Sequence, residues 1–296
     1  KQRGIDLINT GVMCGQTEVF RKWLPECESD NESGEIYLTD VIRLVNNDGG
    51  TVRSIEHDNA WEVTGINRRR QLVEFEREGY ERKIESLWNT GVTIHDPDRV
   101  KIGPWVNVES DVELEGDVTI RGESRIGSGT IIEGNTIIEN SYIGTNNTIV
   151  QSHIRDASTG DEVQIGPYSH VRPGTAVEDD VRLGNFVEIK KSTIQSHTNV
   201  AHLSYVGDAE IGEDVNVGAG TITCNYDGKE KHKTTIESDV FIGSNTELVA
   251  PVTVGEGALI GAGSTVTRDV PPRSLALSRV DQENREGWVN DFWEDS

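Results

Sequence analysis

Residues 108–138 read VESDVELEGDVTIRGESRIGSGTIIEGNTII, and every sixth residue of this stretch is aliphatic. A period of six fits neither the 3.6-residue turn of an α-helix nor the two-residue alternation of a half-buried strand. It fits short parallel strands on the three flat sides of a prism, with a corner after each strand. Each aliphatic side chain then points inward and stacks on its equivalent one coil away. The stretch therefore predicts a parallel β-helix.

The same period extends over most of the later chain. It resumes at Ile165 after an irregular patch and slips by one residue twice before Val217. It then runs without error from Ile236 to Val266, and the residue after the aliphatic one is often Gly or acidic. So many positions in phase predict a mainly β fold built from hexapeptide repeats.

The first ninety residues lack this period. Residues 35–50 have the pattern of a helix, and residues 51–57 have the pattern of a strand. Residues 68–91 carry apolar side chains at helical spacings and end in Gly91, which favours a linker helix. We expect four parts: a remnant of an α/β domain at 1–66, the linker helix at 67–91, the β-helix at 92–281 and a tail at 282–296.

The composition excludes several classes of function. The chain has 296 residues, with 51 Asp and Glu against 28 Lys and Arg, so its net charge of −23 opposes binding to nucleic acid and to anionic membranes. It shows no run apolar enough to cross a bilayer and no secretory signal, so we expect a cytoplasmic protein. Because it starts in mid-pattern without Met, we also expect a fragment. Cys14, Cys27 and Cys224 have no metal-ligand spacing and predict reduced thiols.

Residues 223–235, TCNYDGKEKHKTT, interrupt the repeat and bring three lysines into an acidic chain. The simplest interpretation is a loop that leaves one corner of the prism. Binding elements are often carried on loops held by a rigid scaffold, so a functional loop is expected here.

Several longer stretches resemble one family. Near the start they are INTGVM, GEIYLTDVI and VTGINRRRQL, and in the repeat region they are HVRPGT, GNFVEIKK, AHLSYVGDAEIG, NVGAGTITCNYDG, FIGSNTELVAPV and ALSRVDQENREGW. Together they are similar to the bifunctional GlmU enzymes of bacteria. The resemblance implies a left-handed β-helix that carries an acetyltransferase, preceded by the end of a uridyltransferase domain.

The GlmU family makes UDP-N-acetylglucosamine, a cell-wall precursor, in two steps. It acetylates glucosamine-1-phosphate from acetyl-CoA and then attaches uridylate from UTP with Mg²⁺. The resemblance implies that Asn9 and Asn67 contact UDP-N-acetylglucosamine and that Asn67 is a metal ligand. The Gly-rich loop and the Mg²⁺-binding Asp of the family are missing from this chain. We therefore expect it to lack uridyltransferase activity.

Acetyl transfer to a sugar amine needs a base near neutral pH, and His is the usual choice. His202 matches the catalytic base of the family. Arg172 and Lys190 match positions that bind the sugar phosphate or its uridylated product. They are three hexapeptides apart, so the repeat places them one above the other on adjacent coils. The remaining sugar contacts implied by the resemblance are Glu188, as a hydroxyl acceptor, Tyr205 and Asn216.

The resemblance also implies an acetyl-CoA site and a homotrimer whose sites are built between subunits. The matching acetyl-CoA positions are Ala219, Asn225, Tyr226, Ser244, Ala262 and Arg279. Ser244 and Ala262 are three hexapeptides apart and should line one edge of the prism. Asn225 and Tyr226, in the inserted loop, should reach the site of a neighbouring chain. Lys229, Lys231 and Lys233 either reduce the repulsion of two anionic substrates or are ordinary solubilising side chains.

Two other functions compete with this one. The first is a hexapeptide carbonic anhydrase, whose metal would be held between subunits by histidines such as His170, His197 and His202. It does not account for Tyr205 or Arg279. The second is a β-helix that only trimerises or binds, without catalysis.

Overall fold

The computed structural model describes residues 7–29 and 34–289. The chain divides into two compact units, Lys1–Arg77 and Glu78–Ser296, and each is described by itself. Nowhere in the described ranges is there a helix with the length and apolar character needed to span a membrane.

The first unit is helical. Its elements are α1 (Thr17–Trp23), the 3-10 helix η1 (Leu24–Glu26), α2 (Asp40–Asn47), α3 (Ala60–Val63) and the first half of α4 (Arg69–Trp88). The helix predicted within residues 35–50 is α2. The strand predicted at residues 51–57 is wrong, because no strand is found there. A strand needs a hydrogen-bonded neighbour, and the described part of the first unit contains no other strand to pair with it.

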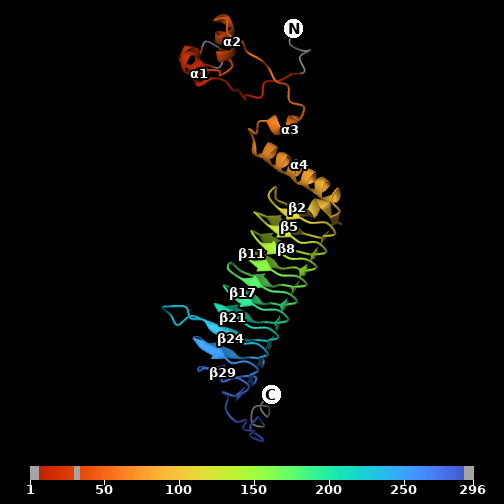
Figure 1. Ribbon diagram of the computed structural model, residues 1–296, viewed down its shortest axis with the longest axis vertical. Coiled ribbons are helices and arrows are strands. Elements are labelled where there is room, and N and C mark those ends of the chain that lie inside the picture. Colours follow the sequence, from red (N-terminus) through yellow and green to blue (C-terminus); the bar gives the residue numbers. More distant parts are fainter. Residues whose placement is uncertain (1–6, 30–33, 290–296) are drawn as a thin grey trace. The chain divides into compact units, whose positions relative to one another are not determined.

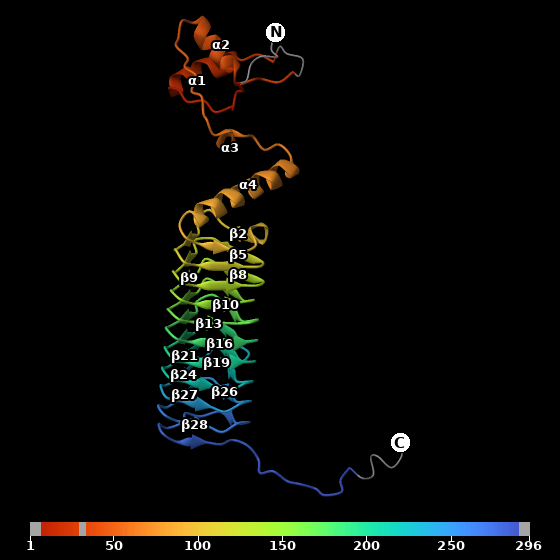
Figure 2. The ribbon, with the colours of Figure 1, turned by 90° about the vertical axis from the view of Figure 1, so that its right-hand side faces the viewer.

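The second unit begins with the second half of α4 and a short 3-10 helix, η2 (Pro97–Arg99). Its described residues then form three parallel sheets, in which consecutive strands of the chain up to β29 belong to sheets A, B and C in turn, and β30 returns to sheet A. Figures 1 and 2 show the coils stacked one on another. The predicted β-helix of hexapeptide repeats is confirmed.

The three sheets differ in length by one strand each. Sheet A contains β1 (Thr93–Ile94), β4 (Glu113–Glu115), β7 (Ile131–Glu133), β10 (Thr148–Val150), β13 (Gln164–Ile165), β16 (Arg182–Asn185), β19 (Asn199–His202), β22 (Asn216–Val217), β25 (Phe241–Ile242), β28 (Leu259–Ile260) and β30 (Leu275–Ala276). Sheet B contains β2 (Val100–Ile102), β5 (Val118–Arg121), β8 (Thr136–Glu139), β11 (His153–Arg155), β14 (His170–Val171), β17 (Glu188–Lys190), β20 (Tyr205–Gly207), β23 (Ile222–Cys224), β26 (Glu247–Val249) and β29 (Thr265–Val266). Sheet C contains β3 (Asn107–Val108), β6 (Arg125–Ile126), β9 (Tyr142–Ile143), β12 (Ser158–Thr159), β15 (Ala176–Val177), β18 (Thr193–Ile194), β21 (Ala209–Ile211), β24 (Thr234–Ile236) and β27 (Val252–Val254).

The core of the prism consists of the aliphatic side chains that set the sequence period. Ile120 pairs with Ile138 across two coils of sheet B, and both side chains are fully buried. In the patch where the period fails, sides of the prism are shorter, and Thr159 takes an inward position. Its hydroxyl oxygen accepts the amide of Asn147 and the backbone N–H of Gly144, both at 3.3 Å. A polar side chain therefore fills a core position where its hydroxyl is hydrogen-bonded.

The corners between sheets are tight, and many contain a residue with positive φ. Asp208 (φ 50°) is the single residue between β20 and β21, and its N–H donates to the carbonyl of Lys190 one coil earlier at 3.0 Å. We call the edge between sheets B and C the B/C edge, and the edge between sheets A and B the A/B edge. Such corners fix the direction of every side chain that flanks them.

The insertion leaves the prism at the B/C edge. Residues Asn225–Lys233, which we call the insertion loop, join β23 to β24, where other coils use a short corner. Figure 1 shows this loop protruding beside β24. The loop predicted to leave one corner of the prism is confirmed.

Truncation of a core side chain should destabilise the β-helix far more than truncation of its neighbour. Ile132 is fully buried, whereas the adjacent Ile131 on β7 points outward and is half-buried. We expect Ile132→Ala to lower the free energy of unfolding by about 2–5 kcal/mol. The measurement is chemical denaturation of both variants, and an equal loss for Ile131→Ala would contradict the inward stacking.

Candidate active site

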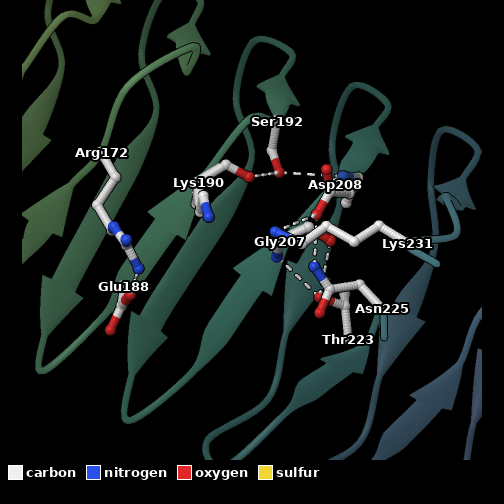
Figure 3. A network of polar contacts seen from close by, with 10 residues as sticks. Arg172, Glu188, Lys190, Ser192, Gly207, Asp208, Thr223, Asn225 and Lys231 are labelled. Carbon is white, nitrogen blue, oxygen red and sulfur yellow. Dashed lines mark hydrogen bonds and ion pairs between the residues drawn. The ribbon is translucent and has the colours of Figure 1, made fainter. Parts of the chain in front are cut away.

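The outward face of sheet B carries a group of charged side chains close to the B/C edge. The backbone N–H of Arg172 donates to the carbonyl of Ile189 at 2.8 Å, so Arg172 lies one coil before Lys190, as the repeat predicted. The guanidinium of Arg172 also donates to the carboxylate of Glu188 at 2.6 Å (Figure 3). Arg172, Glu188 and Lys190 are therefore brought together by the register of two neighbouring strands.

The insertion loop adds a further cation to this group. The nearby ammonium of Lys231 is the largest cause that lowers the pKa of Lys190 from its ordinary value. Arg172 and Lys191 lower it further. Two ammonium groups in contact repel each other, and an anion placed between them would remove that repulsion. We call Arg172, Lys190 and Lys231 the cation cluster.

Asp208 and Asn225 lie beside the cation cluster (Figure 3). The amide of Asn225 donates to the carboxylate of Asp208 at 2.5 Å, and the ammonium of Lys231 lies 4.0 Å from the same oxygen. Asn225 is buried, so its amide is engaged within its own chain. Tyr226, the next residue, is exposed.

Gly207 allows two of the predicted side chains to lie over its backbone. A Cβ at this position would lie 2.4 Å from the hydroxyl of Tyr205 and 2.8 Å from the amide nitrogen of Asn225. The backbone N–H and carbonyl of Gly207 are both hydrogen-bonded to the hydroxyl of Thr223. The absent side chain therefore lets Tyr205, on sheet B, point toward the B/C edge and the insertion loop.

The insertion loop is held by its own hydrogen bonds. One oxygen of Asp227 accepts the backbone N–H groups of Lys229 and Glu230, each at 2.7 Å, and the other lies 2.7 Å from Nε2 of His232. The bond to His232 is the main cause that holds the pKa of Asp227 well below its usual range, and the two backbone donors lower it further. An ion pair between Lys233 and Glu210 ties the end of the loop to sheet C.

His202 lies at a different edge of the prism. It is the last residue of β19 and is exposed at the A/B edge, where Leu203 (φ 47°) turns the chain toward sheet B. The hydroxyl of Ser204 donates to the carbonyl of His202 at 2.8 Å and fixes the backbone of this corner. The imidazole therefore projects from a rigid turn.

The positions predicted to bind acetyl-CoA continue along the same A/B edge. Asn185 pairs with His202 in sheet A, and Ala219, Ser244 and Ala262 follow their strands at equivalent places in later coils. The N–H of Gly263 donates to the carbonyl of Ser244 at 2.8 Å, which confirms that Ser244 and Ala262 lie on one edge. Arg279 donates to the carbonyl of Ala262 at 2.6 Å, so it lies at the end of this row.

One chain thus carries two groups of predicted site residues at two different edges. The cation cluster lies at the B/C edge, and His202 with the row that follows it lies at the A/B edge. Tyr205 is on sheet B, and the exposed Asn216 is on sheet A. The described side-chain hydrogen bonds and ion pairs do not join the imidazole of His202 to Arg172.

Asn9 and Asn67 belong to the first unit and are both exposed. The Oδ1 of Asn9 accepts the N–H of Gly11, and the N–H of Asn67 donates to the side chain of Gln71, each at 3.0 Å. Mg²⁺ is usually held by carboxylates together with water or phosphate oxygens, and the amide of Asn67 carries no charge. Asn67 by itself does not fit a Mg²⁺ site.

The three histidines of the competing zinc hypothesis lie apart in this chain. His170 stacks on His153 on sheet B, with ring centroids 5.1 Å apart, and His197 pairs with Asp180 at the edge between sheets C and A. In the part of the chain that the structure describes, the one cluster of three possible metal ligands is His95, Glu113 and Glu115 on the first coils. His95 and Glu115 are exposed and Glu113 is half-buried; a hydrogen bond of 2.7 Å joins His95 to Glu113, and Glu115 lies on the same strand as Glu113.

Sequence reasoning missed three residues of this site. Asp208 and Gly207 lie in the quoted stretch AHLSYVGDAEIG, but only coordinates show that they contact the insertion loop. The sequence identifies Lys231 as a cation in the insertion loop but does not place it near Lys190. Its signal was its position in an insertion next to one corner of an otherwise acidic scaffold.

A comparison with known proteins agrees with this architecture. Residues 156–191 and 233–268 match the family model "Bacterial transferase hexapeptide (six repeats)". The chain is 47% identical over 289 residues to a protein of Carboxydothermus hydrogenoformans named Bifunctional protein GlmU, and this match covers 98% of the chain. A protein of the same name from Thermotoga petrophila is 45% identical over 287 residues, or 97% of the chain. Over nearly its whole length, the chain is similar to GlmU proteins.

The chain spans 65% of the length of the first of these GlmU relatives and 64% of the second. Among solved structures, it is similar to a UDP-N-acetylglucosamine acyltransferase from Arabidopsis, with 17% identity and a TM-score of 0.45. That match covers 64% of this chain and 70% of the other. The resemblance to GlmU that the sequence motifs indicated is confirmed.

The bonds of Asp227 should keep the insertion loop ordered near neutral pH. Because its pKa is depressed, this stabilisation is fully present above the ordinary carboxyl pKa and is lost only as the pH falls through the lowered value of the folded state. At pH 7 we expect Asp227→Asn to speed hydrogen exchange at the amides of Lys229 and Glu230 roughly tenfold. NMR measures this rate. Glu230→Gln is the control, and a similar rate in both variants would count against the role of Asp227.

Proposed function

We propose that this chain transfers the acetyl group of acetyl-CoA to the 2-amino group of glucosamine-1-phosphate, in the synthesis of UDP-N-acetylglucosamine. The observation that carries the proposal is the cation cluster, which an otherwise acidic chain assembles from two coils and the insertion loop. Similarity to proteins named Bifunctional protein GlmU supports the choice of substrates.

The cation cluster fits a sugar phosphate. Arg172 offers a planar fork of N–H donors suited to phosphate oxygens, and Lys190 and Lys231 contribute two compact positive charges. A bound phosphate would attract both Lys190 and Lys231, and this attraction would offset their mutual repulsion. Glu188, whose carboxylate accepts from Arg172, is the proposed acceptor for a sugar hydroxyl.

His202 is the proposed base. Its imidazole takes a proton from the sugar amine as the nitrogen attacks the thioester carbonyl, and a C–N bond forms. The tetrahedral intermediate then collapses, the C–S bond breaks, and the sulfur takes the proton from the imidazolium of His202, so that CoA leaves as the thiol and the base is regenerated. The products are N-acetylglucosamine-1-phosphate and CoA. Along the A/B edge, the small residues Ala219, Ser244 and Ala262 leave room for a slender chain such as pantetheine beside the backbone.

A second copy of the chain completes the site in this proposal. His202 and the cation cluster occupy different edges of one prism, so a substrate held at one edge needs an imidazole from another chain. A homotrimer about a threefold axis would place the A/B edge of one chain against the B/C edge of its neighbour. Tyr226 and Arg279, both exposed, are the proposed acetyl-CoA contacts at this junction.

The two competing functions account for less of the site. A zinc-dependent enzyme leaves the cation cluster and the row at the A/B edge unexplained. A non-catalytic β-helix does not require three cations to be held together against their repulsion. The nucleotidyl step is not included in the proposal, because Asn9 and Asn67 provide no charge for a metal or a triphosphate.

Removal of the proposed base should abolish most of the activity. We expect His202→Ala to lower the turnover of acetyl-CoA with glucosamine-1-phosphate by roughly 10²- to 10⁴-fold, as followed by release of free thiol. His197→Ala is the matched control, since His197 is also an exposed corner histidine but lies at another edge. An unchanged rate in His202→Ala would defeat the proposal and favour a non-catalytic module.

Removal of one cation should weaken binding of the sugar phosphate specifically. We expect Lys190→Met to raise KM for glucosamine-1-phosphate at least about tenfold and to leave KM for acetyl-CoA nearly unchanged, because one charge-assisted bond is lost. The adjacent exposed Lys191 supplies the control, Lys191→Met. Equal increases in KM for the two substitutions would contradict a direct bond between Lys190 and the sugar phosphate.

A further inference from the structure

Asp208 makes contacts with both ends of the insertion loop. Its carboxylate accepts the amide of Asn225, the first residue of the loop, at 2.5 Å. Its backbone carbonyl accepts the N–H of Thr234, the residue after the loop, at 3.2 Å. Because Asp208 is itself a rigid one-residue corner, these contacts fix where the loop leaves the prism and where it returns.

Asp208 also fixes the loop relative to Lys190. The N–H of Asp208 donates to the carbonyl of Lys190 at 3.0 Å, so its carboxylate lies in the coil immediately after that lysine. The ammonium of Lys231 lies 4.0 Å from this carboxylate (Figure 3). The side chain of Asp208 is only 20% exposed, so its charge is less screened than that of a surface carboxylate.

The negative charge of Asp208 offsets the electrostatic repulsion between Lys190 and Lys231. Without it, Lys231 would move away from Lys190, because like charges at contact distance repel each other and a loop side chain is free to move. The buried amide of Asn225 would also lose its acceptor, and an unpaired buried donor is costly. Asp208 is the acidic residue in the described structure that answers both requirements at once.

We propose that Asp208 is a positioning residue, which clamps the insertion loop and holds Lys231 against Lys190 so that the anion site is formed before substrate binds. This inference rests on the proposed function, because the anion is taken to be the phosphate of the sugar. Asp208 does not contact the reacting atoms. It acts through Lys231 and Asn225.

The first experiment compares two substitutions kinetically. Asp208→Asn leaves an oxygen that accepts from Asn225 but removes the charge beside Lys231. We expect it to raise KM for glucosamine-1-phosphate roughly three- to tenfold, with kcat and KM for acetyl-CoA nearly unchanged. Asp208→Ala removes both contacts and should raise KM for both substrates. Glu210→Gln is the matched control, since Glu210 pairs with Lys233 of the same loop through exposed side chains.

A double-mutant cycle with Lys231→Met tests whether Asp208 acts through Lys231. We expect Asp208→Asn to have no further effect on KM for the sugar phosphate in the Lys231→Met background. A merely structural role would give the same effect in both backgrounds and would overturn the proposal. An effect of Glu210→Gln as large as that of Asp208→Asn would overturn it too.

Limited digestion with trypsin tests the clamp without any substrate. Cleavage after Lys229, Lys231 and Lys233 should be several-fold faster in Asp208→Ala than in the unsubstituted chain or in Glu210→Gln, because protease requires a loosened loop. Equal cleavage in all three would overturn the clamp. If the unsubstituted chain does not turn over glucosamine-1-phosphate, the proposed function fails while the digestion still decides the clamp.

Discussion

The whole second unit depends on the stacking of one aliphatic side chain per six residues on its equivalent in the next coil. Because these side chains are fully buried along most of the prism, each coil is locked to its neighbours both in height and in rotation. Any outward residue therefore has a fixed neighbour one coil away. That constraint alone aligns Arg172 with Lys190, and Ser244 with Ala262, although each pair is well separated in sequence.

The cation cluster shows how positive charge can be concentrated locally on a scaffold of high negative charge. A net charge of −23 produces an unfavourable average field for phosphates, so attraction has to be local. Register brings two cations together at the B/C edge, and the insertion loop adds a third with its own carboxylate partner. Because the average field of the protein repels anions, an anion would be stabilised only where several cations converge.

Much of this structure could be predicted from the sequence, because the period of six reports directly on burial. The interpretation failed where local pattern was not supported by a partner, as at residues 51–57, which have no strand to pair with. It also passed over Thr159 and Thr223, which occupy inward positions and satisfy their hydroxyls with backbone groups of a neighbouring coil. A rule based on aliphatic residues cannot recognise such positions.

For the candidate site, the sequence could predict only the residues aligned by the register of the coils and the roles implied by the resemblance. Register gave the alignment of Arg172 with Lys190 but not the ion pair of Arg172 with Glu188, which depends on side-chain conformation. The contacts of Lys231 and Asp208 arise from the folded path of the insertion loop, which has no period to read. The roles of His202 and of the row along the A/B edge remain predictions drawn from the resemblance.

The insertion loop stands where other coils have a short corner, yet β23 still pairs with β26 in sheet B and β24 with β21 and β27 in sheet C. The packing of the prism core therefore does not require a corner of fixed length, so the insertion loop can differ in length or sequence without disturbing the stacked aliphatic side chains. The insertion loop could therefore be exchanged for another loop, by evolution or by protein engineering. Longer loops inserted at neighbouring corners would give the same prism binding surfaces for other ligands.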